Sequence, residues 1–294
     1  MANDNQPCTL LVDNGSYRPE ATLSLRRIAA ALGEEAGTTV HPVSLLHSTK
    51  VDPADLDGTP AQIFEPFVKA RHAADGTNSF LVVPFFFGHT AAIFEYLPQR
   101  VREMRADWPE LEVRVAPCMV DLDNPEDRTV AGILADLVRR KAGEEGLERP
   151  AVTLVDHGTP RLAVNQVRNH LAAQLREELG SEASAVEASS MERREGDEYA
   201  FNEPLLENLL GTEGFEGEVI LSMLFLSPGR HAGPGGDIAE ICEAAEKGHP
   251  GLRTHMSDLI ASHPRVVDIL AARYRQGLTS EPVKEEVAPP KAAR

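Results

Sequence analysis

The feature that most constrains the fold is a series of segments that occurs twice in the same order. LLVDNGSYRPEA near the start of the chain is matched by TLVDHGTPRLAV, which pairs Asn14 with His157. VHPVSLLHSTK is matched by SAVEASSMERR, which pairs His47 with Glu192, and FEPF is matched by NEPLLE. FLVVPFFFGHTAAIFEYL is matched by VILSMLFLSPGRHAGPGGDIAEI, which pairs His89 with His231. One matched pair arises by chance, but four in order predict two copies of one fold.

Each copy alternates short apolar runs with longer segments of helical period. LLV before Asp13, FLVV before Pro84, VTLV before Asp156 and VILSMLFL before Ser227 are typical of buried strands. LSLRRIAAALGEE and VRNHLAAQLREEL have the apolar spacing of amphipathic helices. Strands that alternate with helices form βαβ units around a parallel sheet. We therefore expect two homologous, doubly wound α/β domains.

The predicted boundary between the copies is the polar, Gly-containing stretch KAGEEGLERP at residues 141–150. The expected domains are residues 1–145 and 146–278, with the candidate site in the second. The remaining segment, 279–294, is charged and Pro-rich and has no apolar period. Such a composition predicts a disordered tail outside the fold.

Composition excludes several classes of protein. The 294 residues are 42% hydrophobic and contain neither a long apolar run nor an N-terminal signal pattern, which predicts a cytoplasmic protein that does not cross a membrane. Three isolated cysteines without a CxxC pair argue against a disulfide framework or a zinc–cysteine site. The net charge of −17 argues against nucleic-acid binding, and an anionic ligand requires basic groups gathered at its site.

Three polar side chains of the second copy follow predicted strands: His157, Glu192 and His231. Ligands of such sheets bind beyond the carboxyl ends of the strands, where the topology brings these ends together. Two imidazoles and a carboxylate can hold a divalent transition metal with coordination positions left open, or act as bases near neutral pH. A single His in such a place is as often an ordinary loop residue, but three together favour a site.

The loop around His231, SPGRHAGPGGDI, is rich in glycine, so its backbone N–H groups can form a concave anion site. Asp237 is expected to cap the following helix. The loop lacks the P-loop Lys, which disfavours a nucleotide site. The nearby basic groups are Arg161, Arg193, Arg194 and Arg230. The alternative interpretation is a long surface loop with solvated arginines.

The first copy keeps fewer potential ligands. Asn14 is a poor transition-metal ligand, and the loop FFFGHTAAIFEYL is shorter and lacks GPGG, although His47 and His89 remain. Its phenylalanines, at least two of which are expected in the core, could also form an apolar wall for a flat ligand.

The segments VDHGTPR, MERRE…NEPLLE and LFLSPGRHAGPGGDI resemble those of the class II tetrapyrrole chelatases, most closely the sirohydrochlorin cobaltochelatase/ferrochelatase group in its long, two-half form. The resemblance covers nearly the whole chain. It implies two flavodoxin-like domains that face each other across a cleft, and insertion of Co²⁺ or Fe²⁺ into sirohydrochlorin. It also implies that His157 and His231 hold the metal with Glu192 as acidic partner. The expected substrate contacts are Gly158, Thr159, Arg161, Arg193, Gly229, Arg230, Gly235, Gly236 and His89.

The divalent metal is thus expected as a substrate, with no organic cofactor, and His and carboxylate ligands do not discriminate among Co²⁺, Fe²⁺ and Ni²⁺. The expected partner is an anionic tetrapyrrole, and the expected state is a monomer or weak homo-oligomer. Asn14 motivates an alternative, a non-catalytic metal- or tetrapyrrole-binding protein of the same fold. A hydrolase or transferase that uses Asp156 and His157 is a weaker hypothesis, because no GxSxG elbow is present.

Overall fold

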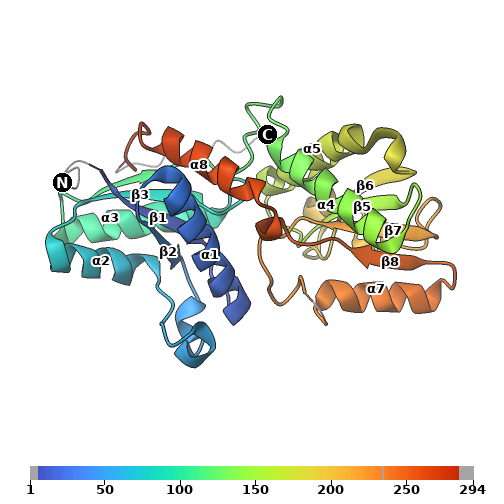
Figure 1. Ribbon diagram of the computed structural model, residues 1–294, viewed down its shortest axis with the longest axis horizontal. Coiled ribbons are helices and arrows are strands. Elements are labelled where there is room, and N and C mark those ends of the chain that lie inside the picture. The colour runs from blue at the N-terminus through green and yellow to red at the C-terminus, as the bar shows by residue number, and fades with distance from the viewer. Residues whose placement is uncertain (1–5, 234, 285–294) are drawn as a thin grey trace. The chain divides into compact units, whose positions relative to one another are not determined.

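The computed structural model describes residues 6–233 and 235–284, which form two four-stranded parallel sheets covered by helices (Figure 1). The first sheet has the order β2-β1-β3-β4 and the second has the order β6-β5-β7-β8. Both orders are the beginning of the flavodoxin-like order 2-1-3-4-5. The repeated topology confirms the α/β class and the two copies of one fold.

The strands of the first sheet are β1 (Cys8–Asp13), β2 (Val40–Ser44), β3 (Ser79–Pro84) and β4 (Glu112–Val115). Those of the second sheet are β5 (Ala151–Asp156), β6 (Ala185–Ser190), β7 (Glu218–Met223) and β8 (Arg253–Met256). The predicted apolar runs coincide with β1, β3, β5 and β7, but β7 ends at Met223 and residues 224–226 begin the following loop.

The helices that cover the first sheet include α1 (Pro19–Ala36), α2 (Phe64–Asp75) and α3 (Leu97–Asp107). Helices α4 (Thr129–Glu145), α5 (Leu162–Leu179), α6 (Leu206–Leu209), α7 (Asp237–Gly248) and α8 (Arg265–Gly277) follow in the chain. Short 3₁₀ turns occupy Ser48–Lys50, Pro53–Leu56, Gly180–Glu182, Asp197–Asn202 and Ile260–Ser262, and a π turn occupies Ala92–Tyr96.

Burial explains why the central strands are apolar without alternation. Leu10, Leu11 and Val12 of β1 are completely buried, as are Val152, Leu154 and Val155 of β5. Both faces of a parallel sheet are covered by helices, so side chains that point in either direction must be apolar. Helix α1 buries Leu25, Ile28 and Leu32 on one face, as its spacing predicts.

The chain forms two compact units whose limits differ from the predicted domains. The first unit runs to Cys118 and includes the described segment from Leu270 to residue 284, and the second is Met119–Ile269. Helix α4, expected in the first domain, packs on α5 and β7, both in the second unit. The end of α8 packs on the first sheet, where a Cβ on Gly277 would lie 2.7 Å from the Ala116 side chain. The apolar period of a segment predicts a helix, but it does not predict which sheet that helix packs against.

The predicted linker and tail are both shorter than expected. Residues 141–145 belong to α4, which ends at Gly146 in the left-handed conformation with φ 67°. At the other end, Val283 donates its N–H to the carbonyl of Val113 at 2.8 Å and so extends the first sheet's edge. The prediction of a tail outside the fold from residue 279 is therefore wrong for this part, and residues 285–294 lie outside the described residues.

Strand register corrects two of the four sequence pairs. Leu46 donates its N–H to Asn14 O, and Glu192 donates in the same way to His157 O, at 3.1 and 3.2 Å. The equivalent of Glu192 is therefore Leu46, and the pairing with His47 was wrong by one residue. Short motifs compared across turns of unequal length do not reveal such a shift.

The second correction concerns the two Glu-Pro dipeptides. Ile63 bridges Ser44 in the first unit, and Leu205 bridges Ser190 in the second. Glu65 follows the first bridge and lies inside α2, whereas Glu203 precedes the second bridge. The dipeptides therefore occupy different places, and their match was accidental.

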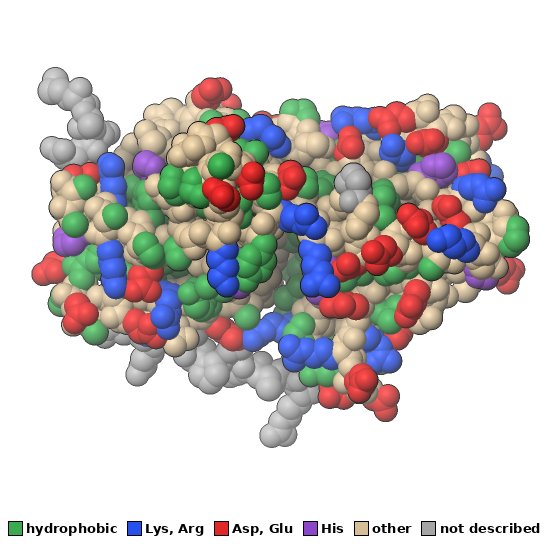
Figure 2. Space-filling view, turned by 90° about the horizontal axis from the view of Figure 1, so that it is seen from below, with side chains coloured by type: hydrophobic (Ala, Val, Ile, Leu, Met, Phe, Trp, Pro, Cys, Tyr) green, Lys and Arg blue, Asp and Glu red, His purple; other side chains and the backbone are tan. Residues whose placement is uncertain are grey.

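The surface is strongly charged, as the composition requires. Acidic and basic side chains are interspersed over the face shown in Figure 2. Within residues 6–233 and 235–284, no helix is both long and apolar enough to span a membrane.

Candidate metal centre in the second unit

The site begins at the turn that follows β5. Asp156 ends the strand, and the chain turns at Gly158 with φ 90°. A Cβ on Gly158 would lie 1.8 Å from the carbonyl oxygen of Glu192, so only glycine permits this crossing of the two loops. The crossing holds the backbones of His157 and Glu192 together through the hydrogen bond between them.

The structure places the three predicted ligands near one another. The ring centroids of His157 and His231 are 4.4 Å apart, and the rings are inclined at 70°. The Nε2 atom of His157 lies 3.5 Å from Oε1 of Glu192. Among the described residues, however, no group of three His, Cys, Asp or Glu side chains is arranged to hold a metal ion. The side chain of Glu192 is 63% exposed.

Hydrogen bonds determine which imidazole nitrogen each histidine presents. Nδ1 of His157 lies 3.1 Å from the carbonyl oxygen of Gly158. Nδ1 of His231 lies 2.6 Å from Oδ2 of Asp237. Both partners are acceptors, so each Nδ1 carries the proton when the ring is neutral. Both Nε2 atoms then keep a lone pair for a metal or a proton.

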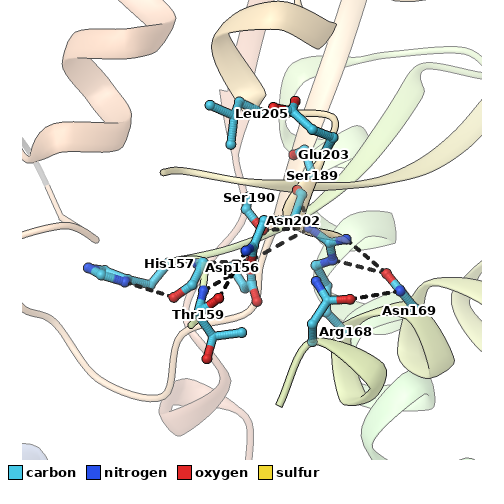
Figure 3. Close-up of polar contacts among 12 residues, drawn as sticks. Asp156, His157, Thr159, Arg168, Asn169, Ser189, Ser190, Asn202, Glu203 and Leu205 are labelled. Atoms are coloured by element: carbon cyan, nitrogen blue, oxygen red, sulfur yellow. Dashed lines mark hydrogen bonds and ion pairs between the residues drawn. The ribbon is translucent and has the colours of Figure 1, made fainter. Parts of the chain in front are cut away.

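A buried polar network supports the turn (Figure 3). Oδ1 of Asp156 accepts hydrogen bonds from Gly158 N at 3.0 Å and from Ser190 Oγ at 2.6 Å. Arg168 of α5, only 2% exposed, donates to Ser190 Oγ and to the carbonyl oxygen of Asn202 at 2.9 Å. Its Nη1 is 4.0 Å from Asp156 Oδ1. Burial raises the pKa of Asp156, while Ser190 and the Arg168 charge oppose the rise.

Asn202 connects this network to the turn. Its Oδ1 accepts from Thr159 N at 3.0 Å, and its Nδ2 donates to Thr159 O at 2.9 Å. The turn that carries His157 is thus fixed on both sides by side chains that are almost completely buried. Sequence reasoning missed both Arg168 and Asn202. Arg168 had a detectable signal, because a charged residue stands in register with Leu171 and Leu175 on the buried face of α5.

The glycine-rich loop folds upon itself and does not offer all its amides to a ligand. Gly229 N donates to Ala232 O, and Gly236 N donates to Gly233 O, both at 3.1 Å. Gly235 has φ 68°, and a Cβ on Gly236 would lie 2.7 Å from Arg230 O. These glycines therefore serve the loop's own conformation. Helix α7 is capped by Gly236, so the prediction of Asp237 as N-cap was wrong by one residue.

The predicted substrate contacts have different surroundings. Arg230 is 79% exposed, with Nε 3.7 Å from Asp237 Oδ2. Arg193 is engaged by Glu203 at 2.7 Å and by the carbonyl oxygen of Gly196. Arg161 precedes α5 and is half-buried, and its N–H donates to Thr159 Oγ1. His89 belongs to the first unit, where its ring lies 3.8 Å from that of Phe94.

The phenylalanines of the first unit divide as expected. Phe85 and Phe86 are buried in the core, whereas Phe94 is 41% exposed. The core role predicted for at least two of them is confirmed.

An acidic groove of about 580 Å³ adjoins the candidate ligands. Its lining includes the carboxylates of Glu192, Glu207, Asp237 and Glu240. A groove lined by one sign of charge raises the local concentration of counter-ions. The groove therefore favours a divalent cation over a polycarboxylate as its occupant.

Comparisons with known proteins show a similar family and similar folds. Residues 151–277, which contain all three candidate ligands, match the model of the CbiX family. SirB from Bacillus subtilis with Fe³⁺ is 14% identical, with 93% of this chain and 96% of that chain covered and a TM-score of 0.67. The sirohydrochlorin chelatase SirB from Bacillus subtilis subspecies spizizenii in complex with cobalt is also 14% identical, with 93% and 95% covered and a TM-score of 0.59.

A third structure, CbiX, the terminal enzyme for biosynthesis of siroheme in denitrifying bacteria, is 15% identical, with 92% and 98% covered and a TM-score of 0.59. No curated protein matches the chain. The resemblance to the class II chelatases predicted from the sequence is confirmed by the family model in the second half and by the shared fold over the whole chain.

Proposed function

We propose that this protein inserts a divalent metal ion, Co²⁺ or Fe²⁺, into a sirohydrochlorin-type tetrapyrrole, and that His157, His231 and Glu192 of the second unit perform the reaction. The observation that carries the proposal is the approach of the two imidazoles to 4.4 Å, each with Nδ1 hydrogen-bonded and Nε2 left for a ligand. The match of residues 151–277 to the CbiX family model supports it.

Metal insertion requires two events at one place. A hydrated M²⁺ must exchange water for the pyrrole nitrogens, and two pyrrole N–H protons must leave. Imidazole Nε2 atoms suit Fe²⁺ and Co²⁺ as ligands and replace part of the hydration shell while other positions stay open. Positioning the ion against the ring converts an encounter into an oriented reaction.

The protons need an acceptor that can pass them to water. Glu192 lies 3.5 Å from His157 Nε2 and is 63% exposed, so it is in reach of both the imidazole and solvent. We assign it the role of proton acceptor and of occasional third metal ligand. The imidazoles themselves are the other bases that the site offers near neutral pH.

The substrate's carboxylates need positive charge, because the protein carries a net charge of −17. Arg230 is 79% exposed and therefore open to such a substrate. Arg193 is less suitable, because Glu203 already neutralises it at 2.7 Å. Binding of the macrocycle between the two halves stays a prediction from the resemblance.

The test is the rate at which purified protein forms the metallated macrocycle from sirohydrochlorin and Co²⁺ or Fe²⁺, followed by absorbance without oxygen. We expect His157→Ala and His231→Ala each to lower the rate at least about 100-fold, because each removes a metal ligand or base. His255→Ala is the matched control. His255 lies on β8, its Nε2 is 2.7 Å from Oε2 of Glu218, and its substitution should leave the rate unchanged.

Full activity in the His157→Ala/His231→Ala double variant would contradict the proposal. Tight binding of the macrocycle with no acceleration by the unmodified protein would favour the alternative, a non-catalytic binding protein of this fold.

A further inference from the structure

We infer that Asp237 is a positioning residue of the metal centre: its carboxylate holds His231 in the tautomer with Nδ1 protonated and orients Nε2 toward the metal. The inference rests on the proposed function for the identity of what Nε2 binds. The orientation itself rests on contacts within the second unit.

The hydrogen bond between the two side chains is short and partly buried. Oδ2 of Asp237 is 2.6 Å from Nδ1 of His231, and the side chains are 34% and 32% exposed. A carboxylate acceptor is stronger than a neutral one and makes the imidazole a better donor to a metal. Such outer-sphere carboxylates typically contribute 10–100-fold to metal affinity.

The loop geometry explains why a residue six positions along the chain reaches the imidazole. The chain turns back at residues 235 and 236, so that Ile238 N donates to His231 O at 3.3 Å. A Cβ on Gly236 would lie 2.9 Å from that same carbonyl oxygen. Asp237 is the first residue of α7, so its backbone is fixed by the helix.

The two histidines of the pair are therefore held by different means. Nδ1 of His157 faces a backbone carbonyl, that of Gly158, at 3.1 Å. His231 depends on a side chain that substitution can remove. The other charged group beside Asp237 is Arg230, with Nε 3.7 Å from Oδ2. Glu192 and Glu240 line the same groove.

The first measurement is the tautomer of His231 in the metal-free protein, read from ¹⁵N chemical shifts and two-bond couplings of the imidazole. We expect the Nδ1–H form to dominate in the unmodified protein and the Nε2–H form to gain population in Asp237→Ala. Glu240→Ala is the matched control, because it also removes an acidic residue from the first turn of α7 and from the groove. It should leave the tautomer unchanged.

The second measurement is the dissociation constant for Co²⁺ from the d–d absorption of the bound ion. We expect Asp237→Ala to weaken binding about 10–100-fold, and Glu240→Ala to weaken it less than about threefold, because a screened groove charge acts weakly. Asp237→Asn keeps the size of the side chain and guards against a misfolded loop, and it should weaken binding about tenfold because the amide lacks the charge.

Unchanged tautomer and unchanged Co²⁺ affinity in Asp237→Asn and Asp237→Ala would overturn the inference, as would an equal loss in Glu240→Ala. Failure of the proposed function has a different signature. In that case the unmodified protein binds Co²⁺ through His231 but does not accelerate metallation of sirohydrochlorin. Absence of Co²⁺ binding by the unmodified protein would overturn both.

Discussion

The turns that follow β1 and β5 have nearly the same backbone and different chemistry. Gly15 and Gly158 have φ 88° and 90°, and a Cβ on either would lie within 1.8 Å of a carbonyl oxygen in the neighbouring loop. The preceding residue is Asn14 in one turn and His157 in the other. The backbone crossing is thus a property of the fold, whereas the ligand is a property of one copy.

The residues around the aspartate that ends each strand also differ between the two units. Helices α1 and α5 each have 18 residues and begin six residues after the strand's final Asp, so Leu25 and Arg168 occupy the same position. Asp156 has Arg168 and Ser190 as neighbours. Asp13 likewise accepts hydrogen bonds from Ser44 and Gly15, although its Oδ1 is buried with no hydrogen-bond partner among the described residues. Burial raises the pKa of Asp13 to about 6.

A buried carboxylate is costly unless a charge or several donors compensate it. In the second unit the Arg168 charge adds to the donors Ser190 and Gly158 at the turn that carries His157. In the first unit Ser44 and Gly15 also hydrogen-bond the carboxyl, but Leu25 stands in place of the cation and Asn14 in place of His157. A cation at this position is therefore not a general requirement of this fold, and we propose that Arg168 supports the turn that carries His157.

The largest expected effect comes from making the second unit resemble the first. Arg168→Leu leaves Asp156 buried without its cation and removes the donor to Ser190 and Asn202 O. Breaking a buried ion pair on one side costs about 3–5 kcal/mol. We expect a loss of about 4 kcal/mol in the local stability of the second unit, measured by hydrogen exchange of the β5 and β6 amides.

Arg176→Leu is the control for this substitution, since Arg176 lies on the same helix with its side chain 52% exposed and bonds mainly to Val186 O. It should cost less than about 1 kcal/mol. If Arg168→Leu cost no more than that, the network would be an incidental feature of the second copy.

The next effect concerns the buried carboxyl of Asp13 in the first unit. The folded pKa of Asp13, about 6, lies above the ordinary value of 3.8. The folded state therefore binds the proton more tightly, and the stability of the first unit falls as the pH rises from about 4 to about 6. Asp13→Asn should remove this loss, which amounts to about 3 kcal/mol at pH 8 from two pKa units, and should change little at pH 4.

Urea unfolding at pH 4 and pH 8, followed by the fluorescence of Trp108 in the first unit, measures the effect. Asp55→Asn, at an exposed position in the same unit, should alter stability similarly at both pH values. A destabilisation by Asp13→Asn at pH 8 would mean that the hydrogen bonds from Ser44 and Gly15 stabilise the ionised carboxylate by more than burial destabilises it, and the contrast with Asp156 would fail.

Local patterns predicted much of this molecule. Apolar runs and helical period are short-range properties, so β1, β5, α1 and α5 and the α/β class followed from them. The limits of the units did not follow, because tertiary fit decides that α4 packs on α5 and β7.

The candidate site also combines features that local sequence predicts with features that depend on tertiary structure. His157, Glu192 and His231 were identifiable because each follows an apolar run, and parallel topology brings strand ends together. The hydrogen bond from His231 to Asp237 depends on the fold of a glycine-rich loop, which has no period to read. The equivalence of Leu46 and Glu192 depends on strand register, which the motif comparison missed by one residue.

The smallest expected effect comes from the reverse exchange, Asn14→His. This substitution restores the imidazole to the first turn, and yet we expect no second Co²⁺ site, measured as the number of ions bound per chain. Leu46 stands where Glu192 stands in the second unit and offers no ligand. The loop after β3 spans residues 85–91 and is six residues shorter than the loop 224–236 that carries His231.

His89 on that shorter loop is stacked against Phe94 at 3.8 Å instead of against a second imidazole. A stoichiometry of two Co²⁺ ions per Asn14→His chain would contradict this prediction, because it would show that the turn alone determines whether a copy holds metal. An unchanged stoichiometry in Asn14→His that rises when Leu46→Glu is added would sharpen the comparison. Such a result would show that a metal site in the first unit needs a carboxylate at position 46 as well as an imidazole at position 14.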